Sequence, residues 1–253
     1  MLAHVLVALV GAICLARVFA SRSLRLVALL LRTMGPIPRH VAFIMDGNRR
    51  YAKQHDIKTI SGHTSGFEVP RASSALLLLA LKSTLEWSLH LGIHTVTIFA
   101  FSVDNYKRPK EEVDGLMNLA REKLTEFAKE SSFIKKNDIC VRVLGELHML
   151  EPGLREAAIR VARSTRHHKS AILNICFPYT SSLEMKNAVD TAIAGLESGE
   201  ITEQDVLDSP SLLDRLMYTR DCPPLELLIR TSGEIRLSDF LLYQAGPFYI
   251  MLF

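Results

Sequence analysis

Residues 40–52 read HVAFIMDGNRRYA, and the rest of the chain is organised around this stretch. Val41–Met45 is an apolar run of strand length, and it leads directly into Asp46, Gly47 and Asn48. Asp and Asn adopt turn geometries readily, and Gly lets the backbone approach a ligand closely. Two arginines and a helix-compatible segment follow, and the amides that open a helix favour an anion. The stretch predicts a strand that ends at a phosphate site, although an ordinary strand and turn with surface arginines fits the same residues.

The composition fits one substantial α/β domain with an appendage. The chain has 253 residues, and 48% of them are hydrophobic, which excludes a largely disordered protein. The net charge is only +3 and the basic residues are scattered among acids, so no broad nucleic-acid-binding surface is predicted. The four cysteines show no zinc-binding spacing. Two of them, Cys140 and Cys176, lie in apolar strand-like runs, where the buried thiols of a reduced, cytosol-facing domain are expected.

Residues 1–34 are mostly apolar and are predicted to associate with a membrane. The apolar run is long enough to span a bilayer, with Arg17 able to snorkel near its end; an interfacial helix and a buried terminal helix are the alternatives. A cleaved signal peptide fits less well because the arginines follow the apolar run. These arginines would leave the main domain in the cytoplasm. The break at Gly35–Pro38 separates the segment from a domain of residues 35–253.

Four further apolar runs predict four more strands, at Thr95–Phe101, Ile139–Leu144, Ala171–Phe177 and Leu225–Ile229. Helical spacing of apolar residues is found in Glu111–Glu130, in Leu154–Val161 and in a segment through Met185, Val189 and Ile193. Strands that alternate with helices, and that are too apolar to have a wet face, predict an open, mostly parallel sheet flanked by helices.

Residues 69–81 disturb this regular pattern. Pro70 and two serines precede the run ALLLLAL, within an otherwise plausible helix that continues to Leu91. Because proline removes a donor and clashes inside a helix, this patch is predicted to be a loop, or a kink followed by an apolar wall.

The polar turns after the first, second and fifth predicted strands should open on one edge of the sheet, beyond the carboxyl ends of the strands, where ligands bind. That edge would gather Asp46, Asn48, Arg49, Arg50, Ser102, Asn105, Arg108, Arg230, Arg236 and Ser238. Its five arginines face the acids Asp46, Asp104, Glu234 and Asp239. This balance favours a polyanion, and two diphosphates with a magnesium ion would suit it. Apolar helices before Leu91 and after Pro109 could enclose a channel, so the pattern suits an isoprenoid diphosphate.

Motifs of several common reaction classes are absent from the sequence. It contains no Walker A motif, no GxGxxG and no nucleophile elbow, which argues against P-loop hydrolysis, dinucleotide chemistry and a serine hydrolase. HExxH is also absent. His90 and His94 have HxxxH spacing, but no acid lies between them and a predicted strand follows at once, so a zinc site is not expected.

Six segments occur in the order of the motifs of a known family: HVAFIMDGNRRYA, GHTSGFE, TIFAFSVDNYKR, VDGLMNLAR, VRVLGELHML and LLIRTSGEIRLSDFLL. On these residues the chain, from about Gly35 to Gln244, resembles the cis-prenyltransferases (undecaprenyl diphosphate synthase-like), and among them the catalytic subunits of eukaryotic dehydrodolichyl diphosphate synthases. The resemblance implies the cis-prenyltransferase fold. It also implies extension of farnesyl diphosphate by isopentenyl diphosphate units, giving dehydrodolichyl diphosphate for dolichol synthesis and protein glycosylation.

The resemblance further implies roles for individual residues. Asp46 would be the magnesium-linked catalytic carboxylate, and the other catalytic residues would be Asn48, His63, Ser102 and Asn105. Substrate contacts are implied for Gly47, Arg49, Arg50, Tyr51, Arg108, Arg230, Arg236 and Ser238. The implied partner is a noncatalytic, Nogo-B-receptor-like subunit whose tail completes the active site. The implied location is the endoplasmic reticulum membrane, with the catalytic domain facing the cytoplasm.

The sequence departs from the family pattern at four places. Thr59 replaces a usual basic residue, Asp104 replaces a usual glutamate, and residues 69–81 look like an insertion of about ten residues, nearly three helical turns. The chain ends at FYIMLF, so a C-terminally truncated domain is expected, whose apolar residues Phe248–Phe253 need a partner or membrane. An inactive truncated isoform or paralogue that acts as a scaffold or binding subunit is the alternative. A bacterial-type homodimeric synthase is disfavoured by the Asn48–Arg50 run and the apolar N-terminus.

Overall fold

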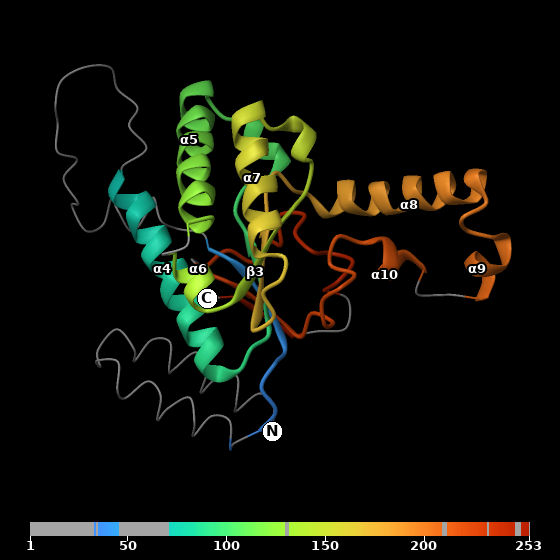
Figure 1. Cartoon of the computed structure of the whole chain (residues 1–253), viewed down its shortest axis with the longest axis horizontal. Helices are drawn as coiled ribbons and strands as arrows, with labels where there is room; N and C mark the ends of the chain where they lie inside the picture. The colour runs from blue at the N-terminus through green and yellow to red at the C-terminus, as the bar shows by residue number, and fades with distance from the viewer. Residues whose placement is uncertain are drawn as a thin grey trace.

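The centre of the structure is a sheet in which every pair of neighbouring strands runs parallel (Figure 1). The computed structural model describes residue 33 and residues 35–45, 71–129, 132–208, 212–231, 233–245 and 249–252, without the side chains of 71–80, 249, 251 and 252. In this part of the chain the strands are β1 (His40–Ile44), β2 (Thr95–Phe99), β3 (Ile139–Leu144), β4 (Ala171–Cys176), β5 (Leu227–Arg230) and β6 (Tyr249–Leu252). Their order in the sheet is β3-β4-β2-β1-β5-β6. The predicted parallel sheet is confirmed.

β6 is a strand that the sequence did not predict. The apolar end of the chain was expected to lie exposed, whereas Tyr249–Leu252 pairs with β5 in the register Leu227↔Tyr249 to Arg230↔Leu252. This pairing satisfies backbone groups of the segment inside the chain. Ile250 remains 42% exposed, and β6 is the outer strand of the described sheet on this side. The expectation that the domain is truncated stays a prediction.

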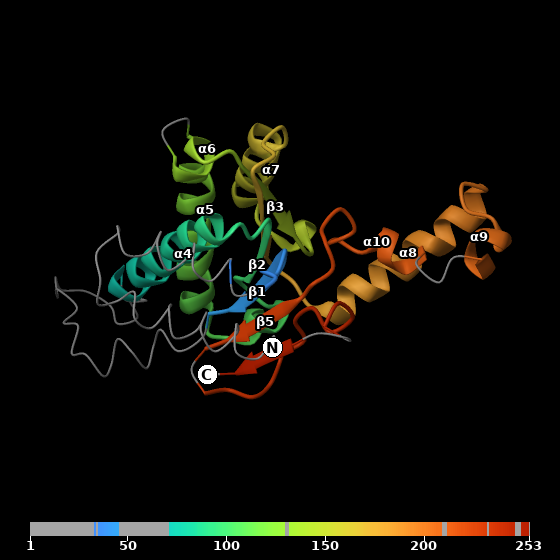
Figure 2. The same ribbon diagram turned by 90° about the horizontal axis from the view of Figure 1, so that it is seen from below.

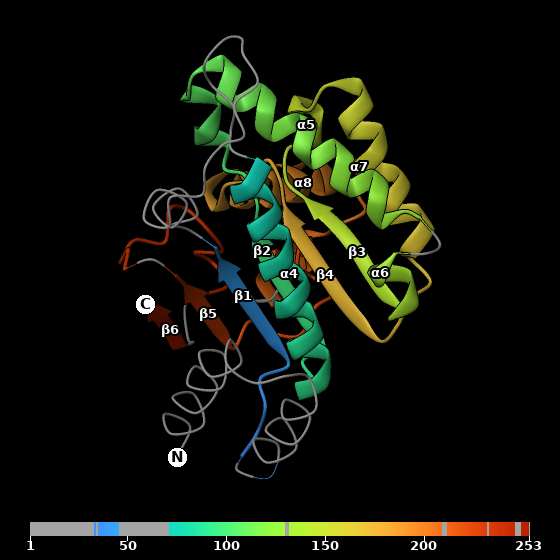
Figure 3. The same cartoon turned by 90° about the vertical axis from the view of Figure 1, so that its left-hand side faces the viewer.

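Helices flank the sheet, and those that pack on its hydrophobic core lie on one face. In chain order they are α4 (Arg71–Leu91), α5 (Lys110–Phe127), α6 (Phe133–Lys136), α7 (Pro152–Thr165), α8 (Ser181–Ser198), α9 (Glu203–Asp208) and α10 (Leu212–Leu216), with the 3₁₀ turns η1 (Val103–Lys107) and η2 (Leu147–Met149). Figure 3 shows α4, α5 and α7 on one face and α8 behind the other. Figures 1 and 2 show α8 extending away from the sheet together with α9 and α10.

Two hydrophobic clusters form the core, one on each face. The larger joins alternate strand residues, such as Val41, Val96 and Val141, to the apolar stripes of α4, α5 and α7. The second joins the residues between them, such as Ala42 and Ile44, to side chains that follow β4 and β5. Because neighbouring strand residues point to opposite faces, strands with apolar residues at consecutive positions serve both clusters. Cys140 and Cys176 are free and buried, as predicted.

α4 corrects the interpretation of residues 69–81. From Arg71 onward the backbone forms a single helix of 21 residues to Leu91, where a loop or a kink was predicted. The described helix contains no proline to break it, and Pro70 lies outside the described residues. Leu81, Leu85 and Leu91 of this helix are buried in the larger core. α4 and α5 therefore supply apolar faces on the same side of the sheet, while the channel between them stays a prediction.

The first residues of the predicted domain and the segment before it are only partly described. Gly35–Arg39 form neither helix nor strand, which fits a break ahead of β1. The predicted membrane-associated segment, residues 1–34, lies outside the described residues apart from Thr33. No helix in the described part of the chain is both long and apolar enough to cross a membrane.

A buried polar row crosses the second face of the sheet. His40 on β1 is 1% exposed; its Nε2 lies 2.8 Å from Thr97 Oγ1 and its Nδ1 lies 2.8 Å from the carbonyl oxygen of Pro223. Asn174 Nδ2 on β4 donates to the same Thr97 hydroxyl at 3.0 Å. Burial lowers the pKa of His40 to about 4, against the opposing effects of the Pro223 carbonyl and the Glu226 carboxylate. The imidazole is therefore neutral at physiological pH.

We predict that His40 makes the fold sensitive to mild acid. The folded-state pKa of about 4 lies below the unfolded value of 6.5, so between these pH values the unfolded state binds a proton that the folded state does not. Stability is thus present above pH 6.5 and is lost as the pH falls. The free energy of unfolding, measured with urea, should fall by about 2 kcal/mol more in the wild type than in His40→Gln between pH 7.5 and 5.

His90→Gln is the matched control for this experiment, because His90 is exposed near the end of α4. This variant should keep the pH dependence of the wild type. An equal loss of stability in His40→Gln and the wild type would contradict the prediction.

Candidate active site

The carboxyl ends of β2, β1 and β5 lie side by side because these strands are consecutive neighbours in the sheet. Ile44, at the end of β1, is in register with Arg230, at the end of β5. The amide of Thr231 donates to the carbonyl oxygen of Ile44 at 3.2 Å. The turn after β5 therefore leaves the sheet beside the last residues of β1, two positions before Asp46 in the sequence.

The predicted residues that follow β1 cannot be placed. Those outside the described residues are Asp46, Gly47, Asn48, Arg49, Arg50, Tyr51 and His63. Their catalytic, metal-binding and substrate-binding roles stay predictions. The described part of the candidate site consists of the turns after β2 and β5.

The turn after β2 is held by a reciprocal pair of hydrogen bonds. Ser102 caps η1: its Oγ accepts from the amide of Asp104 at 3.2 Å, while its own amide donates to Asn105 Oδ1 at 3.1 Å. This is a capping box, in which two otherwise unpaired amides are satisfied at the start of a helical turn. The two predicted catalytic residues of this turn therefore fix each other's position. The Asp104 carboxylate points elsewhere and pairs with Lys107 at 2.6 Å.

Arg108 closes this turn and is oriented by an acid that the sequence analysis missed. Its Nη1 lies 2.8 Å from Oε1 of Glu112, one turn further on in α5. The side chain of Glu112 is only 9% exposed, whereas that of Arg108 is 41% exposed. A buried carboxylate thus holds an arginine that reaches into solvent, where an anionic ligand can meet it. The i,i+4 spacing was a signal for this pair, but the same spacing is common on solvated helix faces.

The turn after β5 folds over a buried arginine. Arg230 is 2% exposed, and its Nη1 donates to Ser238 Oγ at 2.8 Å and to the carbonyl oxygen of Arg236. Arg236 is exposed and pairs with Glu234 at 2.9 Å. Arg230 therefore stabilises the turn from the protein interior, while Arg236 and Ser238 are exposed residues of the turn. Residues 233–237, which include Glu234 and Arg236, form no helix.

Three residues of this turn have left-handed backbone conformations. The φ angles are 54° at Ser238, 56° at Asp239 and 48° at Leu241. For residues other than glycine this conformation costs about 1 kcal/mol or more each. Such a turn persists only where its surroundings determine its shape. Asp239 provides one such contact, because its Oδ1 accepts from the amide of Ser182 at 3.1 Å and its carbonyl oxygen accepts from the amide of Ser181 at 2.7 Å.

Aromatic side chains join the two turns through the second core cluster. Phe99, the last residue of β2, stacks on Phe240 of the turn after β5 with ring centroids 4.6 Å apart. Tyr179, which follows β4, packs edge-on against Phe240 at 6.0 Å and against Phe99 at 6.3 Å. Stacked and edge-on rings add to the stabilisation that burial provides. The two described turns of the candidate site thus rest on one buried aromatic cluster.

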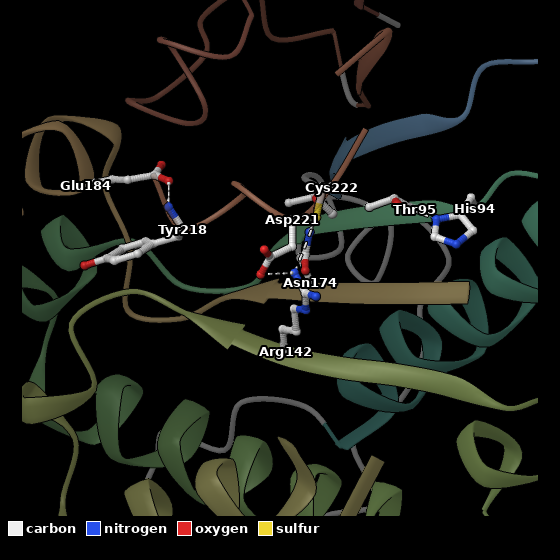
Figure 4. Close-up of polar contacts among 9 residues, drawn as sticks. His94, Thr95, Arg142, Asn174, Glu184, Tyr218, Asp221 and Cys222 are labelled. Carbon is white, nitrogen blue, oxygen red and sulfur yellow. Dashed lines mark hydrogen bonds and ion pairs between the residues drawn. The ribbon is translucent and has the colours of Figure 1, made fainter. Parts of the chain in front are cut away.

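A second group that the sequence analysis missed is the buried carboxylate of Glu184 on α8. It accepts from the amide of Tyr218 at 2.7 Å (Figure 4), from Gln244 Nε2 at 3.1 Å and from the Tyr179 hydroxyl. Burial raises the pKa of Glu184, while these hydrogen bonds act in the opposite direction. The only signal in the sequence was an acid in the first turn of a helix, which is commonly solvated.

Figure 4 also shows how the segment before β5 is tied to the sheet. Arg142 on β3 lies 3.5 Å from Asp221, and Asn174 Nδ2 on β4 donates to the Cys222 sulfur at 3.3 Å. Both contacts lie on the second face of the sheet, next to the hydrogen-bonded row of His40, Thr97 and Asn174. The entry to β5 is thereby anchored, and with it the start of the turn that carries Arg236 and Ser238.

The described carboxylates do not by themselves form a magnesium site. Within the described residues, no three His, Cys, Asp or Glu side chains gather closely enough to hold a metal ion. The acids at this edge are engaged with protein groups: Asp104 with Lys107, Glu234 with Arg236, and Asp239 with an α8 amide. The magnesium prediction therefore depends on Asp46.

Comparisons with known proteins agree with the resemblance noted in the sequence. A family model described as putative undecaprenyl diphosphate synthase matches residues 44–252. The dehydrodolichyl diphosphate synthase complex subunit DHDDS of Homo sapiens is 47% identical over 212 residues, which cover 84% of this chain and 60% of that protein. The complex subunit of the same synthase in Schizosaccharomyces pombe is 42% identical over 210 residues, or 83% of this chain and 75% of that protein.

A solved structure supports the fold. Lavandulyl diphosphate synthase from Lavandula x intermedia, in complex with dimethylallyl diphosphate, matches with a TM-score of 0.70 and 26% sequence identity. The match covers 84% of this chain and 86% of that one. The chain spans about 60% of the length of the human relative.

We predict that Ser102 controls the local stability of the turn after β2. Ser102→Ala removes the acceptor that caps η1, which should cost about 1 kcal/mol and make amide hydrogen exchange in residues 103–107 about fivefold faster. Ser102→Thr keeps a hydroxyl and should exchange at nearly the wild-type rate. Hydrogen–deuterium exchange with mass spectrometry measures this, and peptides from α7 serve as the internal control. Unchanged exchange in Ser102→Ala would show that the cap does not hold the turn.

Proposed function

Because the chain belongs to the undecaprenyl diphosphate synthase-like cis-prenyltransferase family, we propose that it elongates prenyl chains. The reaction condenses isopentenyl diphosphate onto farnesyl diphosphate, and repeated cycles give a long-chain polyprenyl (dehydrodolichyl) diphosphate for dolichol synthesis and protein glycosylation. The allylic C–O bond breaks and releases diphosphate, a new C–C bond forms to isopentenyl diphosphate, and a proton leaves the product. The human relative, a dehydrodolichyl diphosphate synthase complex subunit, supports this choice of product.

One structural observation carries the proposal. Three neighbouring strands, β2, β1 and β5, end at one edge, and two of their turns present arginines there. Arg108 is held by the buried Glu112, and Arg236 lies on a turn that Arg230 supports. Two separate cationic positions, on turns that follow the two neighbours of β1, suit a reaction with two diphosphate substrates. A single phosphate would need only one of them.

Individual residues of the chain would have the following roles in the reaction. Arg49, Arg50 and Arg108 would bind the allylic diphosphate and stabilise the negative charge that develops as it leaves. Arg236 and Ser238 would hold isopentenyl diphosphate on the turn that Arg230 supports. Ser102 and Asn105, fixed by their capping box, would act with His63 in diphosphate departure and proton removal. The apolar faces of α4 and α5 would shelter the allylic cation from water.

Magnesium, a partner and a membrane complete the proposal. Mg²⁺ bound by Asp46 would supply charge neutralisation for the departing diphosphate. The human and S. pombe relatives are named as complex subunits, which supports a heteromer; we propose a Nogo-B-receptor-like noncatalytic partner. The apolar residues 1–34 support attachment to the endoplasmic reticulum membrane, with the domain facing the cytoplasm.

We predict that the full chain, with its partner subunit and Mg²⁺, incorporates radiolabelled isopentenyl diphosphate onto farnesyl diphosphate, and that Asp46→Ala abolishes this incorporation. Asp46 is the predicted magnesium-linked carboxylate, so its loss should remove transition-state stabilisation worth a factor of about 10² or more. Incorporation is measured by extraction of labelled polyprenyl products. Failure of the wild type with its partner would favour a scaffold subunit, and full activity of Asp46→Ala would remove this residue from the mechanism.

We further predict that the two arginines serve different substrates. Arg236→Ala should raise KM for isopentenyl diphosphate about tenfold, because a charge-assisted hydrogen bond is worth about 1.5 kcal/mol, and Arg108→Ala should raise KM for farnesyl diphosphate by a similar factor. Initial-rate kinetics with each substrate varied in turn separate the two effects. Arg160→Ala on the surface of α7, where Arg160 pairs with Glu156, is the control. Equal effects of both variants on both KM values would contradict the assignment.

A further inference from the structure

The carboxylate of Glu184 connects three segments that are distant in the sequence. Glu184 is 1% exposed and lies in the first turn of α8. Its donors are the Tyr179 hydroxyl after β4, the Tyr218 amide before β5, and the Gln244 side chain at the end of the turn after β5. A single buried anion with several donors is a strong and directional anchor.

One of these donors, Tyr179, also contacts the turn after β2 through its backbone. The amide of Tyr179 donates to the carbonyl oxygen of Phe101 at 3.0 Å, and the carbonyl oxygen of Tyr179 accepts from the amide of Val103 at 3.3 Å. Ser102 lies between these two contacts and forms a parallel bridge with Tyr179. These contacts are made by the backbone of Tyr179, so the capped turn that carries Asn105 and Arg108 is held without the hydrogen bond from the Tyr179 hydroxyl to Glu184.

Another donor closes the turn after β5. Gln244 Nε2 contacts Glu184 at 3.1 Å and Thr219 Oγ1 at 3.1 Å. Six residues before Gln244, Ser238 accepts from Arg230, and the next residue, Asp239, is bound to the α8 amides. The turn is thus fixed to the first turn of α8 at both Asp239 and Gln244. Of its left-handed residues, Ser238 directly precedes the first anchor, Asp239 is that anchor, and Leu241 lies between the two anchors.

We propose that Glu184 is a positioning residue for isopentenyl diphosphate. By holding Gln244 and Tyr218, it fixes the conformation of the turn that presents Arg236 and Ser238. Glu184 does not touch the substrate itself. This inference rests on the proposed function, since it assigns isopentenyl diphosphate to that turn. An amide at position 184 would have the size of the carboxylate but would replace one acceptor oxygen with a donor. The Tyr218 amide or the Gln244 NH₂ group would then face another donor.

The test compares Glu184→Gln with Asp190→Asn in the full chain with its partner subunit. Both variants change a carboxylate to an amide on α8, but Asp190 is exposed and pairs with Lys186 at 2.5 Å, away from the turn. Glu184→Gln should raise KM for isopentenyl diphosphate about tenfold and leave KM for farnesyl diphosphate and kcat within about twofold. Asp190→Asn should match the wild type in all three constants.

Tyr179→Phe provides a milder variant if Glu184→Gln folds poorly. It removes only the hydroxyl that donates to Glu184 and keeps the ring that packs on Phe240. It should raise KM for isopentenyl diphosphate by about threefold to fivefold. Thermal unfolding of each variant identifies a general loss of stability. A fall in kcat and a rise in both KM values in proportion to lost stability would overturn the positioning role, as would an unchanged KM for isopentenyl diphosphate.

Binding of inorganic diphosphate, measured by calorimetry without turnover, separates this inference from the proposed function. Glu184→Gln should weaken this binding severalfold relative to Asp190→Asn. If the wild type binds diphosphate but makes no polyprenyl product, and Glu184→Gln weakens the binding, the proposed function fails while the positioning role stands. Equal binding by the two variants would overturn the positioning role even in an active enzyme.

Discussion

The parallel pairing of β1 with β2 on one side and β5 on the other is the constraint on which the candidate site depends. Parallel strands end on the same edge, so the turns after these three strands leave the sheet together. The strands are buried between two hydrophobic clusters, which fixes the points where the turns begin. Charged and exposed residues such as Arg108 and Arg236 can then be presented on turns whose bases are rigid.

Much of this frame could be predicted because the sequence signal is local. A strand buried on both faces reads as a continuous apolar run, and the five runs that were predicted match β1 to β5 with ends displaced by at most two residues. β6 escaped prediction because it is stabilised by pairing with β5, about twenty residues earlier, which its own residues do not indicate. α4 was misread because Pro70 was expected to disturb the helix, whereas the described helix, Arg71–Leu91, contains no proline.

The candidate site, too, could be predicted from the sequence only in part. Ser102, Asn105, Arg108, Arg230, Arg236 and Ser238 could be assigned to one sheet edge from the order of strands and turns. The groups that position them could not, because their partners are remote: Glu184 and Gln244 are 60 positions apart, and Ser182 and Asp239 are 57 apart. Sequence alone also gave no sign that Arg230 would be buried beneath its own turn. Polar turns show where a site lies, whereas its supporting network depends on tertiary contacts.

The left-handed residues of the turn after β5 bear on how the chain folds. Ser238, Asp239 and Leu241 are held in this conformation by α8, which is complete some forty residues earlier. Closing such a long loop costs conformational entropy before any contact is gained. Phe240 and Leu241 of the turn belong to the second core cluster, so the site and that face of the core are expected to be completed in the same late step. Opening of the turn in the native state would expose Phe240 and Leu241, so the site is expected to stay ordered unless the second core cluster opens with it.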